Sequence, residues 1–164
     1  MKLFRLSVIA AVILSASAAL AGSDAQKTFD ALKALEGTWE GTNNQGQALK
    51  VSFRSTAGGS ALLSEIHGQG AENMISMIHL DGDRLLLTHY CGAGNQPRMK
   101  ATLEPDGKSV SFDFVDATNL ASPDSGHMHR VIFSFPDPNH HTEEWTFLDH
   151  GKEMKELFTL QRSK

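Results

Sequence analysis

From residue 38 to residue 160 the chain is a succession of short segments in which apolar and polar side chains alternate. Leu49, Val51 and Phe53, for example, alternate with polar residues, which is the pattern of a strand with one buried and one exposed face. Gly, Asp and Pro residues separate these segments, and Asp81-Gly82 is typical of a tight hairpin turn. The pattern predicts about ten antiparallel strands that follow one another in space.

A chain so rich in strands has to protect the edges of its sheet, because exposed edges pair with other chains. Closing the sheet on itself removes the edges, and about ten strands enclose an interior wide enough for a small ligand. The short connections favour an up-and-down barrel over a sandwich. Segment 28–36 has Phe29, Leu32 and Leu35 at helical spacing, which predicts one short helix that rests on the sheet or closes one end.

The first residues have the three-part pattern of a secretory leader. A positively charged start precedes the apolar run Leu6–Leu14, and Ala19-Leu20-Ala21 matches a signal-peptidase site. The apolar run is too short to cross the ~30 Å hydrocarbon core of a bilayer, so no stable membrane insertion is expected. We therefore expect removal of residues 1–21, export to the periplasm or beyond the cell, and a single domain over residues 22–164.

Composition narrows the class of partner. Without the leader the chain has 13 basic and 19 acidic residues, a net charge of −6 with no basic cluster, which argues against nucleic acid as a partner. Cys91 is the only cysteine, so no internal disulfide forms, and a buried, inert thiol is expected. Phosphate-binding loops, paired-cysteine zinc spacings and catalytic serine elbows are absent from the sequence, so we name no cofactor.

Gly37-Thr38-Trp39, which follows the predicted helix and opens the first strand, resembles the Gly-x-Trp start of lipocalin-like (calycin) barrels. The resemblance implies that Trp39 packs across the barrel floor and that Arg162, at the end of the last strand, covers it. The stretches HLDGDRLLLTHYCGAGNQPRM, FDFVDATNL and GHMHR are similar to a group of uncharacterised exported bacterial proteins of calycin-like architecture. That second resemblance implies the fold and no particular activity.

The segment GTWEG also resembles the first strand of nitrobindin-like haem barrels, which have ten strands. In those proteins the haem-ligating histidine lies close to the C-terminus. Here the corresponding strand has the sequence LFTLQR, without a histidine. The resemblance therefore extends to the barrel and stops short of the haem ligand, and a metal or haem barrel is kept only as an alternative.

The hairpin over residues 109–135 has one register that suits both of its faces. This register sets Phe112 opposite Val131 on the inner face and Asp113 opposite Arg130, an opposite-charge pair, on the outer face. A slip by one residue would expose every phenylalanine of the hairpin.

Continued to the end of the hairpin, the same register gathers Asp116, His127 and His129 at the mouth of the barrel. Two histidines at i and i+2 share a face and, with a carboxylate, can bind a metal ion. A carboxylate-oriented histidine can also act as a general base, as in an isomerase or hydrolase. We favour a structural or ligand-orienting role, which is the commoner one for a buried Asp–His pair. The expected ligand-binding residues are Phe112, Phe114, Asp116, His127, His129 and Trp145, with His89 and Arg98 as further candidates.

Other polar residues are less informative. His89 shares a face with Leu85 and Leu87, but both faces of that hairpin are apolar, so the sequence does not decide which is inward. Arg98 can hold a ligand carboxylate, although a solvated guanidinium is the default. His140 and His141 lie in the turn PDPNHH and are expected in solvent. The sequence predicts an exported barrel for a small, partly apolar molecule, and leaves the ligand, any catalysis and the oligomeric state open.

Overall fold

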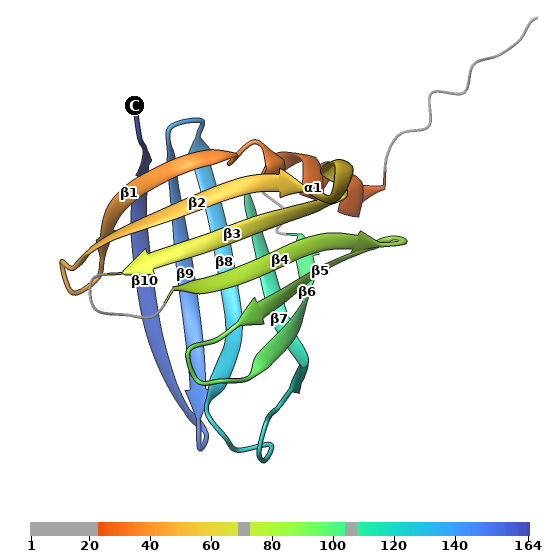
Figure 1. The fold of residues 1–164 in the computed structure, drawn as a ribbon, viewed down its shortest axis with the longest axis vertical. Helices are drawn as coiled ribbons and strands as arrows, with labels where there is room; N and C mark the ends of the chain where they lie inside the picture. Colours follow the sequence, from red (N-terminus) through yellow and green to blue (C-terminus); the bar gives the residue numbers. More distant parts are fainter. Residues whose placement is uncertain (1–22, 69–72, 104–107) are drawn as a thin grey trace, which may run out of the picture.

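The computed structural model describes residues 23–68, 73–103 and 108–164. The expected leader, residues 1–21, lies outside these ranges. Ten antiparallel strands form a closed barrel in which sequence neighbours pair and β1 pairs with β10 (Figure 1). The predicted up-and-down barrel is therefore confirmed. The elements are α1 Asp24–Lys33, β1 Gly37–Asn43, β2 Ala48–Thr56, the 3-10 turn η1 Ala57–Gly59, β3 Ala61–Gly68, β4 Met74–Asp81, β5 Arg84–Tyr90, β6 Gln96–Leu103, β7 Ser109–Thr118, β8 His127–Asp137, β9 His140–Asp149 and β10 Lys152–Arg162.

The helix α1 starts earlier than its apolar spacing predicts. Ser23 caps it, because the Ser23 Oγ accepts a hydrogen bond from the backbone N–H of Gln26 at 3.2 Å. The helix lies across one end of the barrel, which we call the floor, and contacts β2, β4, β5 and β6 (Figure 1). Phe29 and Leu32 of α1 are buried against the barrel. Leu35, just after the helix, is buried as well.

Trp39 and Arg162 make the contact at the floor that the calycin resemblance implies. The Trp39 ring is fully buried, and its Nε1–H donates to the backbone oxygen of Leu35 at 2.7 Å. The Arg162 guanidinium lies 4.2 Å from the Trp39 ring centroid, a cation–π distance. Arg162 also donates to the backbone oxygens of Ala34 and Glu36, at 2.8 and 2.6 Å. One side chain of β10 thus ties together β1 and the end of the helix.

β1 and β10 approach closely where the barrel closes. A Cβ added at Gly41 would lie 1.9 Å from the backbone oxygen of Thr159 in β10. Because a backbone atom cannot move aside as a side chain can, only glycine fits this position of β1. β1 pairs with β10 from Trp39 to Asn43, and Asn43 lies opposite Phe158. The part of β10 before Phe158 therefore extends beyond β1, toward the other end of the barrel.

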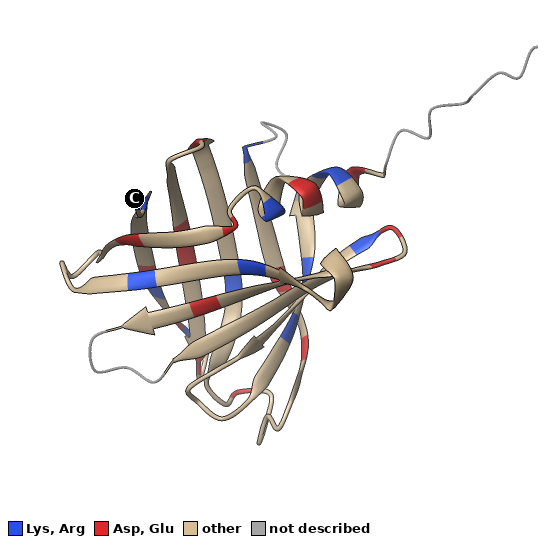
Figure 2. Ribbon diagram, turned by 45° about the horizontal axis from the view of Figure 1, so that its top comes forward, with Lys and Arg blue, Asp and Glu red and all other residues tan. Residues whose placement is uncertain are grey.

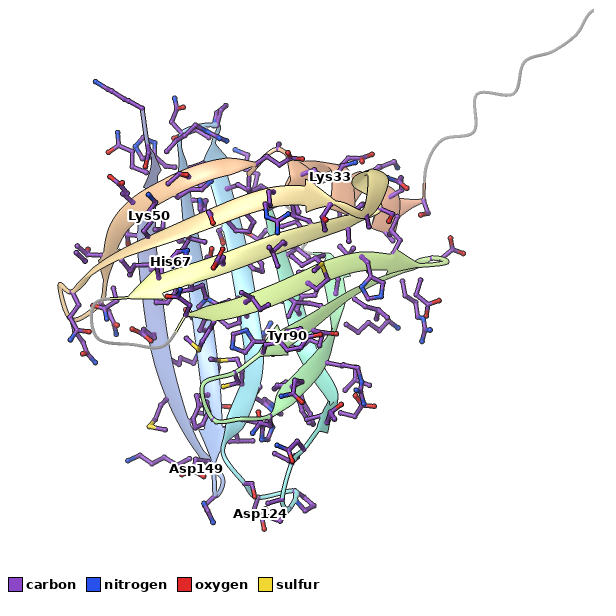
Figure 3. The ribbon with its side chains drawn as sticks, viewed as in Figure 1. Lys33, Lys50, His67, Tyr90, Asp124 and Asp149 are labelled. Carbon is purple, nitrogen blue, oxygen red and sulfur yellow. The ribbon has the colours of Figure 1, made fainter. Side chains whose placement is uncertain are left out.

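That other end, the mouth, is formed by the connections at residues 43–48, 91–95, 119–126 and 149–151. Figure 3 labels Asp124 and Asp149 there, and Lys33 at the floor. The backbone N–H of His150 donates to the backbone oxygen of Asp124 at 3.0 Å, which joins the β7–β8 connection to the β9–β10 turn.

The predicted register of the β7–β8 hairpin is confirmed from Ser109 to Asp113. Phe112 lies opposite Val131, and Asp113 lies opposite Arg130 with the carboxylate 3.2 Å from the guanidinium Nε. The interior is filled mainly by aromatic and branched apolar side chains. Its largest fully buried members include Trp39, Phe112, Phe133, Leu32, Leu62, Ile78, Leu85, Leu87, Met99 and Leu160.

Most charged side chains lie on the outside of the barrel, and the fully buried Glu143 is an exception. Figure 2 shows positive and negative positions interspersed over the strands and the helix. Among the residues that the structure describes, no lysine or arginine is buried. Cys91 is partly buried at the end of β5, where full burial was expected. Within the same ranges, no helix combines the length and the apolar character needed to span a membrane.

Candidate functional site

A pocket of about 190 Å³ opens at the mouth, beside the part of β10 that extends beyond β1. Alternation along β9 directs Trp145 and Phe147 inward, and β10 sets Glu156 opposite Trp145 and Met154 opposite Phe147. The pocket is smaller than the ~300–1,000 Å³ of sites for drug-sized ligands, so it suits a small molecule. Its lining residues are Gln45, Met128, Trp145, Phe147, Met154, Lys155 and Glu156. We call it the mouth pocket.

The polar side of the mouth pocket is held in place by the β1–β2 turn. The Asn43 Nδ2–H donates to the Glu156 carboxylate at 2.7 Å. The Asn43 Oδ1 accepts from the backbone N–H groups of Gln45 and Gln47, at 3.0 and 2.9 Å. The pocket therefore combines apolar and sulfur-containing walls with one oriented carboxylate.

Behind Trp145 lies a row of three buried polar residues on neighbouring strands, Ser64, Ser76 and His89. Ser64 lies opposite Ser76, and Ser76 lies opposite His89. The His89 Nδ1 is 2.9 Å from the Ser76 Oγ, and the imidazole centroid is 4.9 Å from that of the Trp145 ring. His89 is fully buried. This resolves the question that the sequence left open, since the face of β5 that carries Leu85, Leu87 and His89 is the inner one.

Two atoms of this polar row, the His89 Nε2 and the Ser64 Oγ, have no hydrogen-bond partner among the described residues. A buried donor or acceptor without a partner costs roughly 1–3 kcal/mol. Such a row inside an otherwise apolar barrel is therefore a candidate for polar contact with a ligand.

Burial lowers the pKa of His89 from 6.5 to about 4, because desolvation disfavours the charged imidazolium. Between these two values the unfolded chain binds a proton that the folded chain does not bind. We therefore expect His89 to reduce stability progressively from pH 6.5 down to pH 4, by up to about 3 kcal/mol. Urea unfolding over this range compares the wild type with His89→Phe, whose stability should fall less on acidification. Parallel pH profiles would contradict the assignment.

A second buried polar group, formed by His141, Glu143 and Trp145, lies along the inner face of β9. The His141 Nε2 is 3.1 Å from one oxygen of the Glu143 carboxyl group, and the Trp145 Nε1–H donates to the other at 2.9 Å. His141 and Glu143 are both completely buried. The His141 ring packs edge-on against Trp39 at a centroid distance of 4.3 Å.

The expectation that His141 is solvated was therefore wrong, whereas His140 is indeed exposed. β9 begins at His140, one residue before His141. Sequence reasoning also missed Glu143. Alternation counted backward from Trp145 carries the signal for both residues, because it puts Glu143 and His141 on the face of an inward tryptophan.

Asp116 does not join the predicted cluster at the mouth. Met99 lies opposite Phe114 but Arg98 lies opposite Asp116, so Val115 is an extra residue in β7. Such a bulge reverses the alternation beyond it, and Asp116 is exposed on the outer face. Its carboxylate accepts from the Arg98 Nε–H at 2.6 Å, and this hydrogen bond raises the pKa of Arg98. Arg98 therefore binds Asp116 on the outside of the barrel, away from the mouth pocket.

A second bulge, at His129 in β8, changes the predicted placement of the two histidines. Met128 pairs with Phe147 and Arg130 with Thr146, so the bulge directs Met128 into the mouth pocket. The His127 Nε2 is 3.2 Å from the His129 Nδ1, and the Phe114 ring packs against both imidazoles. His127 is 2% exposed and His129 is partly buried. The structure therefore keeps these two histidines together without Asp116, at the rim of the mouth.

The residues that could bind a metal ion or haem do not come together in the described part of the chain, as the metal and haem alternatives require. Asp116 is separated from His127 and His129 by its outward turn, and the described residues contain no group of three or more His, Cys, Asp or Glu that could hold a metal ion. The inward positions of β10 are occupied by Met154, Glu156, Phe158 and Leu160. Because none of these is a histidine, they do not fit the haem that the nitrobindin resemblance implies.

The remaining predicted ligand-binding residues divide between pocket and core. Trp145 lines the mouth pocket, and the His89 ring packs against the Trp145 ring. Phe112 is fully buried in the core, where its ring packs against Phe133 at a centroid distance of 5.9 Å. Phe114 packs on the histidines at the rim.

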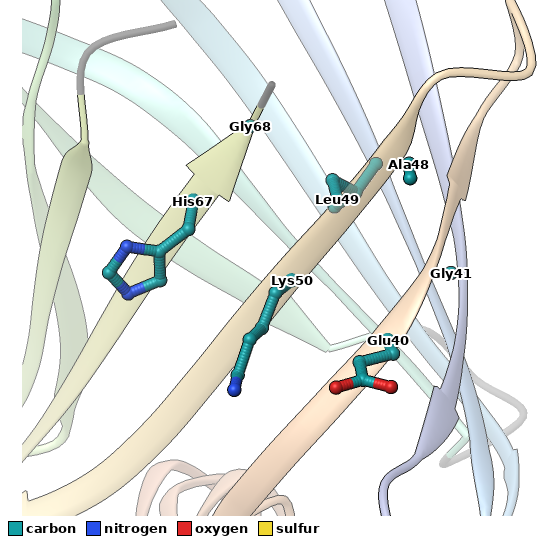
Figure 4. A pocket seen from close by; sticks show the side chains of 7 residues that line it. All are labelled: Glu40, Gly41, Ala48, Leu49, Lys50, His67 and Gly68. Atoms are coloured by element: carbon teal, nitrogen blue, oxygen red, sulfur yellow. The ribbon is translucent and has the colours of Figure 1, made fainter. Parts of the chain in front are cut away.

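Two further hollows lie outside the barrel interior. One, of about 340 Å³, lies over β1, β2 and β3, where Figure 4 shows Glu40, Lys50 and His67 on three neighbouring strands. The other, also of about 340 Å³, lies between α1 and β8 beside Phe135 and Arg162. The first is a charged surface row and the second is an apolar crevice at the floor, so neither has the enclosed polar groups of the interior.

Comparison with known proteins supports the fold. No protein-family model and no curated protein matches the chain. Among solved structures, the barrel is similar to the crystal structure of Rv2717c from M. tuberculosis, with a TM-score of 0.56 and 15% sequence identity. The match covers 83% of this chain and 97% of that one. A ten-stranded antiparallel barrel with this neighbour fits a calycin-like fold.

Proposed function

We propose that this protein is an exported barrel that binds a small, partly apolar molecule in the mouth pocket. The supporting observation is the pocket itself, in which Met128, Trp145 and Phe147 form apolar walls and the Glu156 carboxylate is fixed by Asn43. A concave, mainly apolar site with few oriented polar groups is typical of small-molecule binding. The buried polar row behind Trp145 gives the interior a second means of recognising a ligand.

Binding is tested with para-fluoroethylbenzene, a small apolar probe whose fluorine resonance reports contact with the protein. We expect saturable binding to the wild type. Met154→Arg should weaken it by about tenfold or more, because a bound probe would desolvate the introduced charge. The matched control is Leu157→Arg, a second partly exposed residue of β10 that lies opposite Glu144, outside the mouth pocket.

The control should bind the probe as the wild type does. If the probe fails to saturate, or if Met154→Arg and Leu157→Arg have the same effect, the mouth pocket is not the binding site. Circular dichroism of both variants checks that the barrel is retained.

We also infer export from the leader pattern in residues 1–21. N-terminal sequencing of the protein from a periplasmic fraction, expected to begin at Gly22, checks this. An enzymatic function based on Asp116 and His127 has less support, because Asp116 is exposed and bound to Arg98. The carboxyl–imidazole pair inside the barrel is Glu143–His141, and its complete burial among aromatic rings favours a structural role.

A further inference from the structure

The buried row of Ser64, Ser76 and His89 can be assigned donors and acceptors from its hydrogen bonds. His89 is neutral near pH 7, because burial lowers its pKa to about 4, so only one ring nitrogen carries a proton. If the Ser76 O–H donates to the His89 Nδ1, one bond satisfies both groups and the proton lies on Nε2. In the reverse arrangement the Ser76 hydroxyl proton and the Nε2 lone pair would both lack a partner among the described residues. The first arrangement is therefore favoured.

The favoured arrangement makes the His89 Nε2–H a hydrogen-bond donor without a described partner. The Ser64 hydroxyl, also fully buried and unpartnered, is a second group that can donate. The complementary chemical group on a ligand is thus a hydrogen-bond acceptor, such as a carbonyl oxygen.

The charges around the interior indicate the overall charge of such a ligand. None of the lysines and arginines in the described ranges is buried, and Lys155, which lines the mouth pocket, is exposed and donates to the Glu144 carboxylate at 3.0 Å. No buried cation in these ranges is therefore present to balance an anionic ligand. The carboxyl groups of Glu143 and Glu156 lie on the inner face and would repel an anion. These carboxyl groups would attract a cation, but a cationic group offers no acceptor to the N–H donor of His89. The group that meets His89 is therefore best an uncharged acceptor.

The walls beside the row are flat and apolar. The Trp145 ring contacts His89 on one side and lines the mouth pocket, whose neighbouring walls are Met128 and Phe147. His89 does not itself line the mouth pocket, so a ligand would reach it past the Trp145 ring. We propose that the His89 Nε2–H, oriented by Ser76, donates a hydrogen bond to the carbonyl of a small uncharged ligand, such as a ketone or ester, whose apolar body extends along Trp145 toward the mouth pocket. This assignment rests on the binding function proposed above.

The test compares para-fluoroacetophenone with para-fluoroethylbenzene, two probes of similar shape of which only the first has a carbonyl. Fluorine NMR gives both affinities, and carbon NMR of a carbonyl-labelled ketone reports hydrogen bonding to its oxygen. We expect the wild type to prefer the ketone by about tenfold, the value of one net hydrogen bond. The carbonyl resonance should shift downfield on binding.

His89→Phe keeps a flat ring of similar size and removes the donor. In this variant the preference for the ketone and the downfield shift should disappear, while para-fluoroethylbenzene still binds. Ser76→Ala should reduce the preference in part, because His89 loses its orienting partner, and it serves as the second variant if His89→Phe does not fold. The matched control is His127→Phe, a buried histidine at the rim, which should keep the preference.

The outcomes separate the two proposals. If both probes bind without preference, if the preference survives in His89→Phe, or if Ser76→Ala leaves the preference undiminished, the anchoring role of His89 is overturned and the binding function remains. If neither probe saturates the wild type, the binding function fails and the anchor fails with it.

Discussion

Replacing His141 by alanine is expected to lower the free energy of unfolding by about 3–5 kcal/mol, because the variant leaves the Glu143 carboxyl group buried with one partner fewer. In the wild type that group has two hydrogen-bonding neighbours, His141 and Trp145, and all of it is inaccessible to solvent. Urea unfolding followed by circular dichroism measures the loss. The cavity left by the imidazole beside Trp39 adds to it.

Two variants control for this interpretation. His140→Ala removes the neighbouring histidine, an exposed residue whose contact with Asp137 is open to solvent, so its effect should be small. The double variant His141→Phe with Glu143→Leu removes both polar partners at similar volume and should recover much of the stability. If the double variant is as unstable as His141→Ala, packing rather than the uncompensated carboxyl group governs this site.

Phe133→Ala is expected to destabilise the barrel by about 3–5 kcal/mol, through lost burial and the cavity that remains. Phe133 is fully buried at the centre of the interior. Its ring lies within aromatic contact distance of Phe53, Phe112 and Trp145, at centroid separations of 6.4, 5.9 and 6.2 Å. Four strands therefore lose contacts at once when this ring is removed.

The matched control is Phe135→Ala, two residues further along β8. Phe135 is only partly buried, at the edge of the core near the floor, so the same substitution should cost clearly less. Equal losses at the two positions, measured by urea unfolding, would contradict a core centred on Phe133. A loss well below 1 kcal/mol at Phe133 would indicate a hydrated interior instead of a packed one.

If His89 anchors a ligand, the two ends of the barrel have different roles, one structural and one in binding. The floor is closed by α1, Trp39 and Arg162, and the middle is filled by aromatic side chains. Recognition is then confined to the mouth pocket and the polar row next to it. The buried Glu143 carboxyl group joins the two regions, since Trp145 donates to it while lining the pocket.

Regular alternation was sufficient to predict much of this structure. It predicted ten strands, the register of the β7–β8 hairpin and the inward direction of Phe112, Val131 and Trp145, because every second side chain of a strand faces the same side. The Gly-x-Trp start similarly indicated the contact between Trp39 and Arg162 through the resemblance to calycin barrels.

The predicted cluster of Asp116, His127 and His129 was wrong for a physical reason that alternation alone does not reveal. A bulge at Val115 turns Asp116 outward, and a bulge at His129 directs Met128 into the mouth pocket. A bulge adds one residue to one strand only, and whether it forms depends on the neighbouring strand.

By itself, then, the sequence determined the antiparallel barrel, its helix and most of its core, since these depend on local periodicity and on burial of apolar faces. The tertiary structure decided several of the polar contacts. The contact between His89 and Trp145 joins strands that are distant in the sequence, and the pairing of Arg98 with Asp116 follows a shift in register. Such contacts depend on how the strands twist, bulge and close around a common axis, which no single segment encodes.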